Sequence, residues 1–567
     1  MLKQGTFINK KYYSILIFAV LCNLANEINI MVDAIIGGNQ LGEIALSAVS
    51  IVSPLSSIIS FINYIIAPGC SILYGIYIGR FDKENAYKAS GVNITSAVLM
   101  SLALSTLLFI FKMPFLHYYG CSGELLAQAS AYYNWYLVRS ITTAVAASMY
   151  YIIIAEGAAF YGMLGTISSI LVNIFLSFVL CKTMGVSGLG LATVISSVVE
   201  TVSYSLYFLN KKCGIRIKLS LDFGILKKAV SLSGSKSFNY IFVAIVDIIM
   251  NKVIIEACGQ SYVAAYSVVN LILSFFIIVA GVYESCQGIC SSYVGEKNNY
   301  GIRNVLSTAL KSVFVLGTIL AVTIFVCAPL MPKIYGLTSP ELVDASVRAS
   351  RILAIATVPY MLSIFAYGIY PILNKPSLSI VMSFLYNFFC PLLLSIPLAY
   401  ILGFDGVSIG MSVCAYLVLI VFICFIRKKY GKNGFPWYLE KTGEESFGYD
   451  LYVTKEIIPE IRDSVKTEFG KRGYENENLE LLIEELYTRI YEKNHGKKVC
   501  SECVLLFGEN YVRIIVRDNG VIFNFINEIN FVESLNSDVL DSLLERMKDK
   551  QYLITTSFNR NEFVFEK

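Results

Sequence analysis

Hydrophobic and polar positions alternate in long blocks over the first 430 residues. A transmembrane helix needs about 20 apolar residues. Stretches of this kind lie near residues 12–36, 44–78, 89–111, 131–155, 163–181, 188–209, 233–257, 262–294, 305–328, 347–370, 376–402 and 406–426. Some exceed the thickness of a bilayer and are expected to tilt or to project from it. The pattern predicts an all-α polytopic membrane protein with 12 transmembrane helices.

The second half of this region repeats the first. Residues 33–85 and 247–299 share a pattern of small and apolar positions. The matching pairs are Gly42 with Gly259, Ala48 with Ala265 and, after one gap, Gly79 with Gly295. Six helices per half place both halves in the same orientation, so we predict two parallel six-helix repeats, residues 1–218 and 219–430, with a binding site between them.

Composition supports a membrane protein. Hydrophobic residues make up 56% of the chain and charged residues 15%, whereas soluble proteins are nearer a quarter charged. Only two His occur, and the 14 Cys show no disulfide spacing, so neither a metal site nor a disulfide framework is expected. Lys and Arg gather in alternate loops, which predicts a multi-pass protein of the cell membrane with both termini cytoplasmic.

Composition changes sharply after Arg427. Residues 431–443 contain several Gly and Pro and are interpreted as a linker before a cytoplasmic tail, residues 444–567. In the tail, residues 455–470, 478–492 and 538–550 are predicted helices. Val499–Phe507 and Tyr511–Arg517 are predicted strands, the latter because apolar residues alternate along it. Together they predict a small α/β sandwich.

Several segments of the first 430 residues resemble one transporter family. The segment MVDAIIGGNQLGEIALSAVS, the turns YIGRFDKENA and YVGEKNN, and the pair LVNIFLSFVL…GVSGLGLATVIS and LYNFFC…GFDGVSIGMS are similar to multidrug and toxic compound extrusion (MATE) transporters. The resemblance implies export of amphipathic, often cationic, compounds driven by an H⁺ or Na⁺ gradient. It also implies two helix bundles that rock about a central cavity.

The resemblance assigns two membrane residues in the first repeat. Asp33 matches the acid of the first helix that is implicated in protonation or cation coupling, although its alternative role is to cap a helix end. Asn173 matches a family asparagine, but Ser177 stands where an aspartate often follows. Glu27 lies two turns before Asp33, off the family pattern, as a second coupling acid or a structurally paired group. Acids within a membrane line a cavity or are paired.

The second repeat adds an acid–amide pair. Asp247 and Asn251 are four residues apart on one helix face, and their oxygens suit Na⁺ or an ammonium group. They either line the cavity or serve the fold. Glu284, in the cytoplasmic half of the second predicted helix of this repeat, is expected to stabilise helix packing or an inner gate.

The tail resembles the histidine-kinase-like ATPase domain in its anti-sigma-factor variant, on the segment LELLIEELYTRIYEKNHGK…YVRIIVRDNGVIFNF. Glu485 keeps the position of the family's base, and Asp518 and Gly520 keep the adenine-binding motif. Arg489 replaces the Mg²⁺-binding asparagine, and no glycine follows Gly520 to form a phosphate lid. The resemblance implies a degenerate fold without turnover and with a regulatory or protein-docking role. Weak adenine-nucleotide binding through Asp518 and an inert folded tail are the alternatives that stay open.

These features predict a cation-coupled exporter of cationic small molecules and not an enzyme. The exporter is expected to need no cofactor other than its coupling ion. The bilayer and a cytoplasmic protein that binds the tail are its expected partners, and nucleic acid is not. Two alternatives stay open. One is a lipid-linked oligosaccharide flippase, and the other is a membrane sensor whose tail sequesters a protein.

Overall fold

The computed structural model describes residues 6–566 except 42, 53, 119–120, 210–218, 260, 335–336, 338, 432–444, 475–478, 498, 523, 526–546 and 555–557. The side chains of residues 6, 26–35, 37–39, 43–44, 46–47, 50, 334 and 554, which include Glu27 and Asp33, also lie outside the described part. The predicted linker at 431–443 lies almost wholly outside it.

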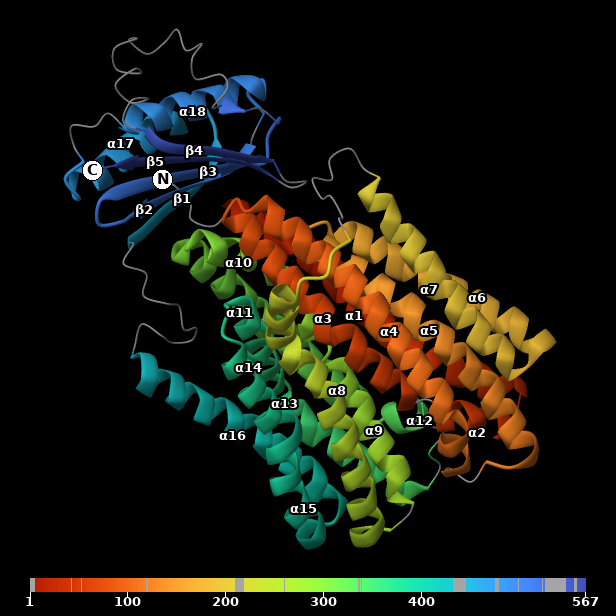
Figure 1. Ribbon diagram of the computed structural model, residues 1–567. Helices are drawn as coiled ribbons and strands as arrows, with labels where there is room; N and C mark the ends of the chain where they lie inside the picture. Colours follow the sequence, from red (N-terminus) through yellow and green to blue (C-terminus); the bar gives the residue numbers. More distant parts are fainter. Residues whose placement is uncertain are drawn as a thin grey trace.

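The first 430 residues form two bundles of long helices (Figure 1). Lipid offers the backbone no hydrogen-bond partners, so apolar runs of this length fold as helices. The N-lobe contains α1 Thr6–Leu41, α2 Glu43–Val52, α3 Pro54–Gly79, α4 Lys83–Tyr118, α5 Gly123–Ala155, α6 Ala159–Met184 and α7 Val186–Phe208. The C-lobe contains α8 Phe223–Ala257, α9 Tyr262–Phe275, α10 Ile278–Glu296, α11 Asn299–Cys327, α12 Met331–Ile334, α13 Pro340–Ile372, α14 Pro376–Phe384, a π-helical turn Leu385–Phe389, α15 Cys390–Leu402 and α16 Phe404–Tyr430.

The helices agree with the predicted spans. Among the described residues, 11 helical segments are long and apolar enough to cross a membrane, and α1 occupies the place of the remaining predicted span. The second span of each lobe consists of two helices, α2 with α3 and α9 with α10.

The two lobes meet along α1, α3, α8 and α10. Glycines bring their backbones together at the end of the bundle nearest the tail, which we call the tail end. A Cβ atom on Gly79 would lie 2.0 Å from the carbonyl oxygen of Ser292, and one on Gly295 would lie 2.2 Å from that of Ile76. The repeat-related ends of α3 and α10 therefore cross in direct backbone contact, and no larger residue fits at the crossing.

The tail is one antiparallel sheet with two helices on one face (Figure 1). Its elements are β1 Glu445–Val453, α17 Ile457–Gly470, α18 Leu479–Lys493, β2 Val499–Phe507, β3 Tyr511–Asp518, β4 Met547–Ile554 and β5 Asn559–Glu566. The strand order is β1-β2-β3-β5-β4. Apolar residues of α17 and α18 pack against the sheet in a core of their own.

Most predicted tail elements are confirmed, and one is wrong. The helices at 455–470 and 478–492 and both predicted strands are present within a few residues. The helix predicted at 538–550 is contradicted where the structure describes it, because Met547–Ile554 is strand β4, paired with β5. Its charged start, MKDKQ, has helical propensity that pairing with β5 overrides. Strands β1 and β5 were not predicted.

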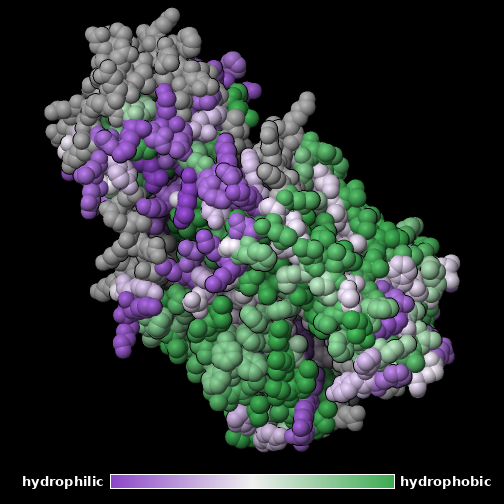
Figure 2. Space-filling view, viewed as in Figure 1, coloured by the Kyte–Doolittle hydropathy of each residue, from purple (hydrophilic) through white to green (hydrophobic). Residues whose placement is uncertain are grey.

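The tail packs against the same end of the bundle at which α1 begins. The backbone amides of Phe7 and Ile8 both donate to the carboxylate of Asp450 on β1, Ile8 at 3.2 Å. Polar side chains gather around the tail, whereas the visible surface of the helices is mainly apolar (Figure 2). The membrane domain and the tail thus form one contiguous structure.

The glycine crossing gives a stability prediction. Gly79→Ala should lower the thermal unfolding midpoint in detergent, because overpacking against backbone costs about 1–3 kcal/mol. Gly234→Ala on α8 is the matched control: its Cβ would lie 3.4 Å from the nearest atom, an ordinary contact. Equal midpoints for the two variants would contradict the backbone crossing.

Candidate functional site

A polar cavity of about 250 Å³ lies between the two lobes. Its lining comes from α1, α3, α5, α6 and α7 of the N-lobe and from α8 and α10 of the C-lobe. Since α3 ends at Gly79 at the tail end, the lining residues Ser56, Ser60 and Asn63 lie in the half of the bundle away from the tail. The cavity therefore lies beyond the glycine crossing, on the side remote from the tail.

One carboxylate ties both lobes together at the cavity wall. Glu284 on α10 is 2% exposed. Its Oε1 accepts from the Lys236 Nζ at 2.7 Å and from the Tyr151 hydroxyl at 3.1 Å. Its Oε2 accepts from the Asn23 amide at 3.0 Å and from the Tyr150 hydroxyl at 3.3 Å. Four donors compensate the loss of water around a buried carboxylate, and three of them belong to the N-lobe.

Aromatic rings surround the other half of this ion pair. The Lys236 ammonium lies 5.1 Å from the ring centroid of Tyr64, 4.9 Å from that of Tyr151 and 5.3 Å from that of Tyr283. It also donates to the Tyr151 hydroxyl. Tyr64 in turn stacks on Tyr240, with centroids 5.2 Å apart. One carboxylate and several aromatic faces form the environment by which proteins recognise organic ammonium groups.

A second acid and a second cation line the N-lobe wall. Glu200 on α7 accepts from the Tyr204 hydroxyl at 2.8 Å, and Arg139 on α5 lies over the ring of Tyr136 at 5.1 Å. Both residues border the cavity. The charged residues described in its lining are thus two acids and two cations, one of each from either lobe.

Three of the five predicted membrane residues, Asn173, Asp247 and Asn251, are not among the described residues that line this cavity. Asn173 is buried on α6, one turn beyond the lining residue Ser169, and accepts from the Ser177 hydroxyl at 3.4 Å. Asp247 on α8 accepts from the Tyr266 hydroxyl of α9 at 3.2 Å. Among the described residues that line the cavity, neither these two nor Asn251 appear. Glu27 and Asp33 lie outside the described side chains, so all five assignments stay predictions.

Sequence reasoning missed the cations. Lys236 and Arg139 each stand within an apolar span, and such placement is itself a signal of function. Glu284 was interpreted as a packing or gate residue, and its contacts across both lobes are of that kind, but it also lines the cavity. Only the tertiary fold shows that residues 236 and 284 form a pair.

The tail places two of its predicted ligand residues together. Asp518 at the end of β3 is fully buried, and its Oδ1 accepts from the Gly520 amide at 2.9 Å and from the Asn559 side chain at 3.0 Å. Its Oδ2 has no hydrogen-bond partner among the described atoms. Burial raises the pKa of Asp518 from 3.8 to about 6. A Cβ on Gly520 would lie 2.5 Å from the Asn494 amide, which explains the glycine.

The third predicted tail residue, Glu485, lies on α18 and is already paired. The Arg489 Nε donates to its Oε1 at 2.9 Å. An arginine in this position brings its own positive charge to the carboxylate, so the pair does not fit the chemistry of a Mg²⁺ site. The assignment of Glu485 to the base position of an ATPase pattern stays a prediction.

The two repeated bundles, the apolar surface of the helices and the polar cavity between the lobes define a multi-pass membrane transporter. Comparison with known families agrees. Residues 18–179 and 237–401 match the family model described as MatE, and the chain belongs to this family. It is a family of transporters, not of enzymes.

Curated relatives match at low identity. The chain is 20% identical over 269 residues to the "Uncharacterized transporter YisQ" of Bacillus subtilis (strain 168), which covers 46% of this chain and 59% of that protein. It is 20% identical to the "Multidrug export protein MepA" of Staphylococcus saprophyticus, over 57% of this chain and 72% of that protein. It is 24% identical to the "Probable multidrug resistance protein YoeA" of B. subtilis, over 60% of this chain and 76% of that protein. The match thus spans less than two thirds of YisQ.

Solved structures share the fold. A MOP superfamily transporter from Pyrococcus furiosus superposes with a TM-score of 0.66 at 22% identity, over 74% of this chain and 96% of that one. An outward-facing multidrug resistance MATE family transporter superposes with a TM-score of 0.68 at 20% identity, over the same shares. The Vibrio cholerae transporter VcmN in its bent form superposes with a TM-score of 0.67 at 18% identity, over 73% of this chain and 95% of that one.

The buried carboxyl of Asp518 gives a pH-dependent prediction. Since its pKa is raised in the folded tail, the stability that the neutral acid provides is present below about pH 4 and is lost as the pH rises through about 6. The loss by pH 7.5 is about 2–3 kcal/mol. Asp518→Asn, which cannot ionise, should protect β3 and β5 from hydrogen–deuterium exchange more than the wild type at pH 7.5 and equally at pH 4. A difference that does not depend on pH would contradict the raised pKa.

Proposed function

We propose that the chain is a secondary active exporter of amphipathic organic cations in the cell membrane, coupled to H⁺ or Na⁺, with its termini and tail in the cytoplasm. The observation that carries this proposal is the environment of the Lys236 ammonium. The protein holds its own primary ammonium between the Glu284 carboxylate and the faces of Tyr64, Tyr151 and Tyr283.

The tethered ammonium of Lys236 acts as a stand-in for a substrate cation. A cationic solute that enters the cavity competes with Lys236 for Glu284, and its apolar part packs on rings such as the stacked Tyr64 and Tyr240. Because Lys236 is 20% exposed toward the cavity, its side chain can yield to the solute without unfolding a helix. Return of Lys236 to Glu284 then favours release of the solute.

The position of the contact between the lobes supports alternating access. The backbone crossing of α3 and α10 closes the tail end, and the cavity lies beyond it. With the tail in the cytoplasm, this arrangement corresponds to an outward-facing state. Rocking of the lobes would separate Gly79 from Gly295 and expose the cavity to the cytoplasm. Glu284, bonded to both lobes, is placed to respond to that motion.

Coupling is assigned to membrane carboxylates. Asp33 is the proposed H⁺ or Na⁺ site of the N-lobe, with Glu27 and Asn173 as accessory groups. Asp247 and Asn251 are the corresponding candidates in the C-lobe. An acid in low-dielectric surroundings binds a proton more readily when its compensating donors move away.

The names of two relatives support the substrate class. MepA is named a multidrug export protein and YoeA a probable multidrug resistance protein. A flippase of lipid-linked oligosaccharides would need a cavity with an excess of positive charge to bind the pyrophosphate. The described cavity instead balances Lys236 and Arg139 with Glu200 and Glu284, which favours the exporter.

The tail is proposed to be a degenerate histidine-kinase-like domain with a regulatory role. Asp518, with one oxygen unpartnered among the described atoms, would accept from the amino group of an adenine nucleotide, with Gly520 beside it. The Arg489 pair at Glu485 argues against turnover. A cytoplasmic protein that docks on the tail is the alternative regulator.

Transport in inverted vesicles tests the proposal. A fluorescent lipophilic cation should accumulate under an imposed pH or Na⁺ gradient. Glu284→Gln should weaken apparent affinity about 10–100-fold, because a charge-assisted contact contributes about 1.5–3 kcal/mol. Asp33→Asn should abolish gradient-driven uptake while leaving folded protein and substrate binding.

The matched control is Glu256→Gln, which removes an exposed acid from α8 whose partner Lys252 is 3.9 Å away. It should transport like the wild type. Uptake that is insensitive to both gradients, or an unchanged affinity in Glu284→Gln, would contradict the proposal.

A further inference from the structure

Six charged side chains meet between the tail sheet and the membrane domain; five of them are buried, and the sixth, Arg513, is 17% exposed. Arg517 is 1% exposed and Arg560 and Glu296 are 0% exposed. The full set is Arg513, Arg517 and Arg560 with Glu296, Glu502 and Glu562. Three positive and three negative charges balance. Burial of ions is tolerated only when each is paired, so separating the two surfaces requires all of them to be hydrated again.

This cluster spans both lobes at their crossing. On the C-lobe, Arg560 Nη1 lies 2.9 Å from the Glu296 carboxylate, and Arg517 donates to the same carboxylate. On the N-lobe, both terminal nitrogens of Arg560 donate to the carbonyl oxygen of Gly79 at 3.2 Å. Gly79 ends α3 and Glu296 ends α10. One guanidinium therefore bridges the two helix ends that must part for the cavity to open toward the tail.

Aromatic contacts hold the two arginines in place. The Arg560 guanidinium lies 4.1 Å from the ring centroid of Phe81, in the turn after α3, and that of Arg517 lies 4.8 Å from that of Tyr293 on α10. The Tyr293 hydroxyl also donates to Glu502 at 2.8 Å. Each arginine is thus fixed by a charge and by a ring, one ring from each lobe.

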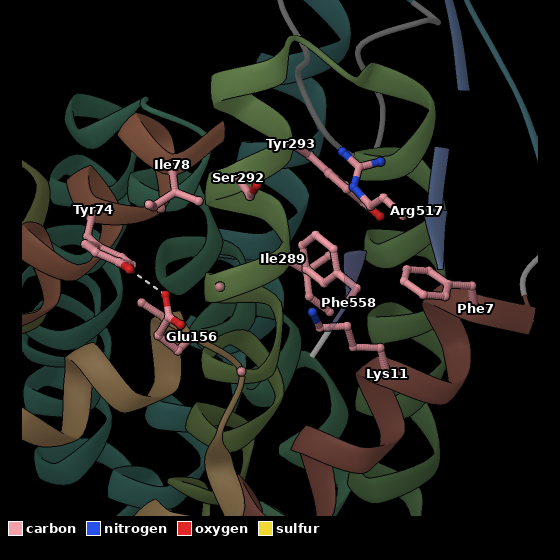
Figure 3. A pocket seen from close by; sticks show the side chains of 14 residues that line it. Phe7, Lys11, Tyr74, Ile78, Glu156, Ile289, Ser292, Tyr293, Arg517 and Phe558 are labelled. Atoms are coloured by element: carbon pink, nitrogen blue, oxygen red, sulfur yellow. Dashed lines mark hydrogen bonds between the residues drawn. The ribbon is translucent and has the colours of Figure 1, made fainter. Parts of the chain in front are cut away.

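A small cavity marks the place where the tail and both lobes meet (Figure 3). It measures about 40 Å³ and is lined by Arg517 and Phe558 of the tail, by Lys11 and Glu156 of the N-lobe and by Ile289 of the C-lobe, among others. The Lys11 ammonium lies 3.9 Å from the ring centroid of Phe558. The tail therefore covers the crossing from the cytoplasmic side.

We propose that the tail is a clamp on the cytoplasmic gate, in which Arg517 and Arg560 hold Glu296 and the Gly79 carbonyl together, so that the transport cycle requires the tail to release. The clamp rests on the proposed function only in that it assumes a transport cycle. The bridging geometry itself does not depend on which substrate is transported. Regulation follows directly, because any event that displaces the tail sheet frees the gate. Arg517 of β3 lies opposite Arg560 of β5 in the strand register, and the next register pair is Asp518 with Asn559. A change at Asp518 therefore occurs one residue away from the clamp.

Chemical access to the small cavity tests the clamp without any substrate. Ile289→Cys, in a full chain otherwise free of cysteine, is exposed to a membrane-impermeant maleimide on the tail side of inverted vesicles. Labelling should be slow with the clamp intact. Arg560→Gln and Glu296→Gln should each raise its rate about tenfold or more, because removal of one partner leaves a buried charge uncompensated. Glu296→Gln leaves the whole tail sequence intact, so loss of tail folding cannot explain agreement between the two.

The control is Arg472→Gln, which removes a tail arginine that pairs with Glu445 and Glu468 of the tail itself. It should label as slowly as the unaltered clamp. Unchanged labelling in both clamp variants, or equal acceleration in the control, overturns the proposal.

A reversible cross-link provides the converse test. Arg80 and Lys548 line one groove between tail and N-lobe, and Lys297 and Tyr511 line it on the C-lobe side. Cysteines replace these four residues, and a reducible bis-maleimide links position 80 to 548 and position 297 to 511. The two links should block both Ile289→Cys labelling and cation uptake until they are reduced. Uptake that continues with both links closed overturns the clamp. If labelling is blocked but no uptake is seen before linking or after reduction, the result supports the clamp and contradicts the proposed substrate.

Discussion

The crossing of α3 and α10 at Gly79 and Gly295 is the contact on which the rest of the structure depends. Both residues are equivalent in the internal repeat, and both lack the Cβ that would collide with the opposing backbone. This single approach brings the lobes together at one end, leaves the polar cavity beyond it and creates the surface on which the tail sits. A gate built from backbone contact is either closed or parted, because there are no flexible side chains to accommodate intermediate separations.

Two charged networks lie on either side of this crossing. On the cavity side, Glu284 joins Lys236 to three N-lobe donors. On the tail side, Glu296 joins Arg517 and Arg560. Both glutamates belong to α10, 12 positions apart, so movement of this one helix alters both networks. This arrangement gives α10 the means to relate occupancy of the cavity to the position of the tail.

The sequence predicted the membrane architecture well, because long apolar runs and an internal repeat are local properties of the chain. It also identified α17, α18, β2 and β3. It missed β1 and β5 and assigned a helix where β4 lies, since these strands are defined by their partners in the sheet. The cavity pair Lys236 and Glu284 was missed for the same reason: 48 residues separate them, and no spacing rule relates them. The clamp was equally invisible, since Arg560 and Gly79 are 481 residues apart.

The central claim is that the tail end of the bundle alternates between a closed crossing and an open gate. Pulsed electron spin resonance between labels at Lys83 and Asn299, the first residues of α4 and α11 that follow the crossing helices, measures that end directly. The account predicts one short distance in the unaltered protein and a second, longer distance that grows in population when Glu296→Gln is introduced. A single distance, unchanged by that substitution and by addition of a lipophilic cation, would contradict it.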